Sequence, residues 1–145
     1  MEQGEKAVLR FLDGTILKGY LEGFTEEGEV ITLRAVGAKT RTTVDTNGLK
    51  AIFFVKTFEG DRQYSEKKSY GIRKAKGRRT FVKFKDGEDM VGFIEGKVPW
   101  EKGFFLSVQR TIKLKGFYLL PADDGSNNNR VFVFAGAVRD VTIVP

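Results

Sequence analysis

The chain contains two copies of one sequence pattern. Residues 7–23 begin with AVLRFLDG and end with GYLEG, and residues 80–96 begin with TFVKFKDG and end with GFIEG, at a constant offset of 73 positions. Asp13, Gly14, Gly19, Glu22 and Gly23 are among the residues that recur unchanged in the second copy, and apolar or basic character is kept at several positions between them. Such self-similarity in a short chain indicates two copies of one supersecondary unit. The repeat therefore constrains the fold more tightly than any other feature of the sequence.

Each copy is predicted to form about five short strands. Asp13-Gly14 and Asp86-Gly87 each lie between two strand-like runs, and an Asp-Gly dipeptide in that place is a strong hairpin signal. Further strands of the first copy are expected over residues 30–34, 40–44 and 51–55. Residues 131–144 repeat the pattern of residues 42–55. The predicted fold is therefore all-β, with two tandem five-stranded, strongly bent small barrels.

The second copy is longer than the first. The offset between the copies grows from 73 to 89 positions, so about 16 additional residues lie between Gly96 and Gly116. We expect them to lengthen the central hairpin, with Pro99 near its tip, because proline cannot donate to a strand ladder. Trp100 is then either a recognition aromatic at an exposed tip or a packed side chain that covers the contact between the two copies.

On this interpretation the chain has three parts. Residues 1–56 form the first small barrel, residues 57–79 a basic linker, and residues 80–145 the second small barrel. A unit of about 60 to 70 residues buries only roughly 60% of its unfolded surface and is marginally stable alone. The two units are therefore expected to pack against each other or against a second copy of the chain, as a homo-oligomer.

The composition argues against an enzyme. The chain has no Cys, which excludes disulfides, thiolate nucleophiles and sulfur-ligated metals, and no His, the commonest general base and transition-metal ligand. No spacing nominates other catalytic groups, so we expect no catalytic residues, no metal and no cofactor. The first residues lack the apolar core of a signal peptide, and no apolar run is long enough to span a membrane. A soluble, cytoplasmic protein without a membrane partner is expected.

The positive charge is concentrated between the two copies. The formal net charge is +6, and residues 56–79 hold nine basic and three acidic residues, so the rest of the chain is balanced. The candidate anion-binding residues are Lys67, Lys68, Arg73, Lys74, Lys76, Arg78 and Arg79. Tyr64 and Tyr70 flank or interrupt this cluster and are candidate recognition aromatics that stack on bases. The alternative is a solvated linker that its charge keeps soluble.

The sequence therefore favours a non-catalytic binding or adaptor module. Nucleic acid is the first candidate ligand, because Lys and Arg side chains that neutralise phosphates release condensed counterions. The competing hypothesis is a protein–protein interaction or assembly module that uses its sheet edges.

Both copies resemble Sm-like barrels. The pattern apolar-x-apolar-x-Asp-Gly, followed by a further Gly, is similar to the first motif of that family, and a short turn before the last strand is similar to the second. The matching segments are 9–19 and 82–92 for the first motif, and 47–52 and 135–141 for the second. The resemblance implies a bent five-stranded fold. It does not extend to the family's uridine pocket, because Glu26-Glu27-Gly28 replaces its Asn loop and Ala135 replaces its Arg.

A second, partial resemblance is to PilZ domains, which bind cyclic di-GMP. Residues 73–79 precede a predicted strand as the Arg-rich segment of that family does, and Asp124-Gly125-Ser126 is similar to the start of its Asp-x-Ser motif. The resemblance implies a cyclic dinucleotide as an alternative ligand of the basic segment.

Overall fold

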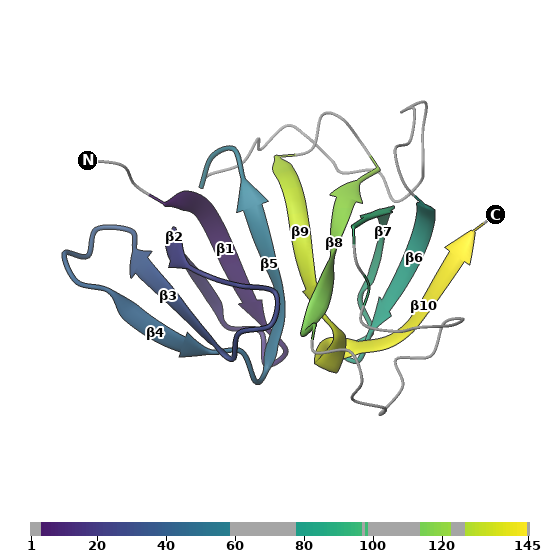
Figure 1. Ribbon diagram of the computed structural model, residues 1–145, viewed down its shortest axis with the longest axis horizontal. Helices are drawn as coiled ribbons and strands as arrows, with labels where there is room; N and C mark the ends of the chain where they lie inside the picture. Colours follow the sequence, from purple (N-terminus) through teal and green to yellow (C-terminus); the bar gives the residue numbers. More distant parts are fainter. Residues whose placement is uncertain (1–3, 59–77, 97, 99–113, 123–126, 145) are drawn as a thin grey trace.

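The computed structural model describes residues 4–58, 78–96, 98, 114–122 and 127–144 (Figure 1). The described part is all-β, as predicted, apart from one 3-10 turn at Ala135–Ala137. Its strands form a single antiparallel sheet in the order β10-β6-β7-β8-β9-β5-β1-β2-β3-β4. The strands are β1 (Glu5–Phe11), β2 (Ile16–Gly23), β3 (Val30–Ala35), β4 (Thr42–Asp45), β5 (Leu49–Val55), β6 (Arg78–Phe84), β7 (Asp89–Glu95), β8 (Gly116–Pro121), β9 (Asn128–Phe134) and β10 (Val138–Val144). None of the described residues belongs to a helix long and apolar enough to cross a membrane.

The two halves of the chain have the same strand arrangement. The order β5-β1-β2-β3-β4 in the first half corresponds to β10-β6-β7-β8-β9 in the second. The registers also agree, because Ala7 pairs with Phe54 and its counterpart Thr80 pairs with Ile143. Even the irregularity between β1 and β5 recurs between β6 and β10, where one additional residue is inserted into the pairing. The sequence repeat is therefore a structural repeat, and the two halves can be compared position by position.

The two Asp-Gly turns are equivalent, as predicted. The Asp13 Oδ1 atom accepts a hydrogen bond from the backbone N–H of Thr15 at 2.8 Å, and the Asp86 Oδ1 atom accepts one from Glu88 at 2.9 Å. The glycine after each Asp has φ of 93° and 94°, which a residue without a Cβ adopts at little cost. Both Asp residues therefore fix the turn between the first two strands of their half.

The two halves share one sheet. β5 of the first half pairs with β9 of the second, from Ala51–Val133 to Val55–Asn128, and we call this pairing the seam. The sheet is not closed: β4 and β10 are its two ends, and they lie on opposite sides of the molecule in Figure 1. Two separate barrels, which the sequence predicts, are therefore not confirmed.

The strands of the seam are buried on both faces. Successive residues of a strand point to opposite faces, so each seam strand contributes to the cores of both halves. The seam residues in the core of the first half are Leu49, Ile52, Phe54, Phe132 and Phe134. Those in the core of the second half are Ala51, Phe53, Val55, Val131 and Val133. Each half thus completes the core of the other.

The additional residues of the second half lie in the connection between β7 and β8. These strands have seven and six residues, and their counterparts β2 and β3 have eight and six. The predicted lengthening of the central hairpin falls on residues 97 and 99–113, which lie outside the described residues, so it stays a prediction. Trp100 lies outside the described residues, as does most of the predicted linker 57–79. β6 begins inside that predicted linker, at Arg78.

Gly92 lies where the neighbouring strand leaves no room for a side chain. A Cβ atom at this position would lie 2.3 Å from the carbonyl oxygen of Leu120 on β8. Its counterpart Gly19 has the same constraint, with the carbonyl oxygen of Arg34 at 2.5 Å. Close approach of the second and third strands is therefore a common property of the two halves.

Replacing Gly92 by Ala should destabilise the fold by about 1–3 kcal/mol, because β7 and β8 must move apart to accommodate the methyl group. Gly136→Ala is the matched control, since a Cβ atom there would have nothing within 4 Å. Urea and thermal unfolding of the two variants measure the difference. Equal stabilities would show that the strands do not approach as closely as described.

Candidate anion-binding face

The predicted anion-binding residues lie only partly in the described chain. Arg78 and Arg79 are the first residues of β6, and both are exposed. Outside the described residues lie Lys67, Lys68, Arg73, Lys74, Lys76, Tyr64, Tyr70 and Trp100. Four strands separate β6 from β1, where basic residues that sequence reasoning did not single out share one surface.

Four basic side chains share the outer face of β1, β2 and β3, turned away from the core of the first half. Lys6 and Arg10 are four residues apart on β1, so they lie on the same face of the sheet. Lys6 pairs with Tyr20 on β2, and Tyr20 pairs with Arg34 on β3. Lys18 is two residues before Tyr20 and therefore lies on the same side. We call the surface formed by Lys6, Arg10, Lys18 and Arg34 the basic face.

Aromatic rings lie between these cations. Phe58, which follows β5, packs almost perpendicular to Tyr20 with their ring centroids 5.4 Å apart. The guanidinium carbon of Arg34 is 4.8 Å from the Tyr20 ring centroid, and that of Arg10 is 5.0 Å from the Phe53 centroid. Cation–π attraction favours both placements. Arg10 and Arg34 are therefore held against rings and are only partly exposed, whereas Lys6 and Lys18 are exposed.

Lys18 of the basic face contacts Phe58, which follows β5 at the end of the first half. Its Nζ atom donates a hydrogen bond to the carbonyl oxygen of Phe58 at 3.1 Å, and the Nζ atom of Lys6 lies 6.0 Å from the Phe58 ring centroid. Ile16 lies two residues before Lys18 on β2, and Val36, directly after β3, donates its backbone N–H to the Lys18 carbonyl oxygen; both are about half exposed and add apolar surface. The predicted basic linker continues directly from Phe58, so it begins at this face.

The acidic residues near the basic face are already paired. Glu22 accepts hydrogen bonds from the Nε atom of Arg34, at 3.4 Å, and from the Nε atom of Arg41. The bond from Arg41 is the main reason why the pKa of Glu22 lies below its ordinary value. Glu5 points to the opposite face of β1, where its carboxylate pairs with Arg130 at 2.8 Å. Glu22 therefore offsets part of the charge of Arg34, but its single negative charge is shared between two arginines, and Glu5 is on the other side of the sheet, so the basic face keeps a positive net charge.

The basic face is specific to the first half. The counterparts of Lys18, Tyr20 and Arg34 in the second half are Val91, Phe93 and Leu120. Two of these, Val91 and Phe93, are buried in a small apolar cluster that Leu120 packs against. The repeat thus keeps its strand pairing while the outer surface differs between the copies.

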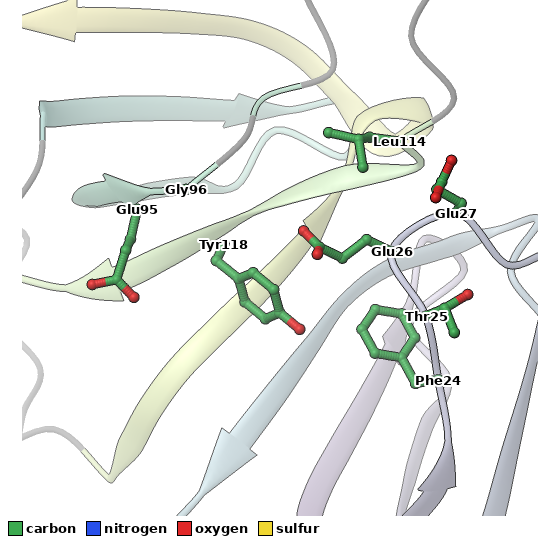
Figure 2. Close-up of a pocket in the computed structure, with 8 residues that line it drawn as sticks. All are labelled: Phe24, Thr25, Glu26, Glu27, Glu95, Gly96, Leu114 and Tyr118. Carbon is green, nitrogen blue, oxygen red and sulfur yellow. The ribbon is translucent and has the colours of Figure 1, made fainter.

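A pocket of about 520 Å³ lies where the β2–β3 connection meets β7 and β8 (Figure 2). Its lining includes the carboxylates of Glu26, Glu27 and Glu95 and the ring of Tyr118. In Figure 2, Glu26 and Glu95 lie on either side of Tyr118. Burial raises the pKa of the Tyr118 hydroxyl, so this group is neutral and adds no positive charge to the pocket. An acidic lining repels phosphate, so this pocket does not suit an anionic ligand. No group of three or more Asp or Glu side chains in the described ranges is arranged to hold a metal ion.

The fold and the basic face define the class of the protein: an all-β chain of two repeated five-stranded halves that share one sheet, with a cationic outer face on the first half. The chain belongs to the DUF6982 family, a family of unknown function, whose model matches residues 3–145. No curated protein and no solved structure matches the chain. The function is therefore inferred from the residues of this chain.

Proposed function

We propose that the chain is a non-catalytic module that binds single-stranded nucleic acid through the basic face. The observation that carries the proposal is the interleaving of cations and rings on one surface, with Lys6, Lys18 and Arg34 around Tyr20 and Phe58. Proteins that bind single strands combine cations that follow the phosphates with aromatic rings or guanidinium planes on which bases stack. The basic face supplies both kinds of group.

The distribution of charge supports an anionic ligand at this position. The nearby carboxylate of Glu22 is neutralised by two arginines, and the acidic pocket between the halves repels a phosphate backbone. The segment that follows Phe58 in the sequence contains further cations, namely Lys67, Lys68, Arg73, Lys74 and Lys76. We propose that these cations contact the same strand of nucleic acid.

Replacing Lys6, Lys18 and Arg34 together by Gln should weaken binding of a single-stranded RNA oligonucleotide by at least about tenfold, because up to three phosphate contacts are lost. The slope of log affinity against log salt concentration should become shallower by about 2, since each contact to a single strand contributes roughly 0.7. Fluorescence anisotropy of a labelled oligonucleotide at several salt concentrations measures both quantities. A DNA oligonucleotide of the same sequence shows whether the face distinguishes RNA from DNA.

The matched control removes the same charge from other surfaces. Lys83, Lys85 and Arg139 are exposed and lie on or beside β6 and β10, away from the basic face, so their replacement by Gln should retain most of the affinity. Equal losses in the two triple variants would show an effect of net charge alone and contradict the proposed face. A wild-type protein that binds neither RNA nor DNA would refute the proposal, and cyclic di-GMP titrated in the same buffer tests the PilZ-like alternative.

A further inference from the structure

The seam has a structural counterpart at each end of the sheet. The register equates β4 with β9 and β10 with β5, and these are the strands that pair in the seam. Among the described strands, β4 and β10 are the sheet's two ends (Figure 1). A second copy of the chain that placed its β4 on β10 would repeat the seam, and such a head-to-tail contact does not close on itself in a pair. The side chains at the ends therefore decide whether copies of this chain join.

The apolar residues of the seam are replaced by polar residues at the ends. Phe132 and Phe134 of β9 correspond to Thr43 and Asp45 of β4. Ala51 and Phe53 of β5 correspond to Asp140 and Thr142 of β10. All four seam residues are buried, and all four counterparts are exposed. The ends thus have the strand geometry of the seam without its apolar side chains.

A copied seam would have to bury carboxylates. The seam register pairs Ala51 with Val133, so the same register between two copies would place Asp140 opposite Val44 of the next copy. Asp45 would occupy the place that Phe134 has in the core of the first half. Taking a carboxylate out of water is unfavourable unless a cation and further hydrogen bonds replace the water.

The ion pairs beside the seam are only half retained at the ends. Glu5 and Arg130 pair at 2.8 Å beside the seam, and their counterparts at the ends are Arg78 and Arg41. In a contact between two copies, Arg78 of one copy and Arg41 of the next would therefore repel each other. The pair of Lys50 with Asp86 corresponds to Arg139 with Asp13, which is favourable. β4 is also short, with four residues against seven in β9. Short strands and charged residues are the usual protection of a sheet edge against pairing with another chain.

We infer that the two ends of the sheet are blocked forms of the seam, and that Thr43, Asp45, Asp140 and Thr142 prevent copies of this chain from joining head to tail. The inference is independent of nucleic-acid binding. It answers, for copies of this chain, the hypothesis of assembly through sheet edges: the fold supplies the strands for such assembly, and the side chains oppose it.

The test restores the apolar residues one end at a time. One variant carries Thr43→Phe and Asp45→Phe, and the other carries Asp140→Ala and Thr142→Phe. Wild type should sediment as a monomer over a wide concentration range. The two variants, when mixed, should form a one-to-one dimer that grows no further, because its outer ends remain polar. Its association should be at least about a hundredfold tighter than that of wild type with itself, since each buried Phe adds roughly tenfold.

The control is a variant with Lys56→Phe and Glu95→Phe, which places two aromatic rings at exposed positions of the central part of the sheet, after β5 and at the end of β7, and should not dimerise. Circular dichroism and urea unfolding verify that every variant is folded, and Val replaces the introduced Phe residues in any variant that is not. Concentration-dependent oligomers of wild type that Asp140→Lys abolishes would overturn the inference. A mixture of the two folded variants that stays monomeric would also overturn it.

Discussion

Replacing Phe132 by Ala should lower the free energy of unfolding by about 3–5 kcal/mol, the range for truncating a fully buried Phe. The Phe132 side chain is 0% exposed. Its ring centroid lies 4.9 Å from that of Phe24, 5.0 Å from that of Tyr118 and 5.1 Å from that of Phe134, each in an edge-to-face arrangement. The truncation removes these contacts and leaves a cavity at the seam. Urea unfolding, followed by far-ultraviolet circular dichroism, measures the loss in the free energy of unfolding.

The position of Phe132 makes this substitution a test of the shared core. The residue belongs to the second half but packs in the core of the first, so its loss should perturb amide NMR signals in β1 and β3 as well as in β9. Thr43→Ala at the counterpart position on β4 is the control, and it should change stability by no more than about 0.5 kcal/mol because Thr43 is exposed. A Phe132→Ala variant as stable as the control would contradict a core shared across the seam.

The local parts of the fold are predictable from the sequence because local residues determine them. Asp13-Gly14 and Asp86-Gly87 form their turns through a carboxylate two residues before the N–H that it accepts and a glycine with positive φ. Both requirements are visible in the dipeptide itself. The equivalence of the halves follows from the repeat for the same reason, down to the matching irregularity next to the last strand of each half.

The seam is a non-local pairing, and the sequence contains only an indirect sign of it. Residues 51–55 and 131–134 are uninterrupted apolar runs, which is the pattern of strands buried on both faces. Such a pattern indicates that each strand is covered on both sides, but it does not name the covering partner. The five-stranded halves therefore look like separate barrels until the pairing of β5 with β9 is known.

A count of charges along the sequence does not reveal the basic face. Outside residues 56–79 the basic and acidic residues balance in number, so no excess is visible there. Alternation along β1 separates them, because Lys6 faces outward while Glu5 turns to Arg130 on the opposite side. Tyr20 and Phe58 are 38 positions apart in sequence, and only the sheet brings their rings together. The detectable signal was the alternation of basic with apolar or aromatic residues in two adjacent strands.

Lys50 connects the halves through a buried ion pair. Its side chain is 4% exposed, and its Nζ atom lies 2.8 Å from Asp86 Oδ2, with Glu88 as a second carboxylate partner and the Phe84 ring centroid at 4.8 Å. The carboxylates are more accessible, with side chains 29% and 41% exposed. Removing the acids therefore leaves a buried cation unpaired, whereas removing the cation leaves acids that water can reach.

Replacing Asp86 by Asn and Glu88 by Ala should cost about 3 kcal/mol, the lower end of the range for breaking a buried pair, because truncating Glu88 admits some water. Asn can still accept the turn hydrogen bond, so the cost reports mainly on Lys50. Lys50→Met should change stability by no more than about 1 kcal/mol, and adding it to the double variant should recover most of the loss. Urea unfolding of wild type and the three variants measures these differences.

The free energy of unfolding should depend on pH differently in wild type and in Lys50→Met, as measured by the same urea unfolding assay. The hydrogen bond from Lys50 is the main cause of the lowered pKa of Asp86 in the folded state. A carboxyl group with a lowered folded pKa stabilises the fold above its unfolded pKa, and this contribution disappears as the pH falls through the folded pKa. Wild type should therefore lose more stability than Lys50→Met between neutral pH and roughly pH 2, because the variant lacks most of the shift. Parallel pH profiles, or a Lys50→Met variant as unstable as the double acid variant, would show that Lys50 does not couple the two halves through these carboxylates.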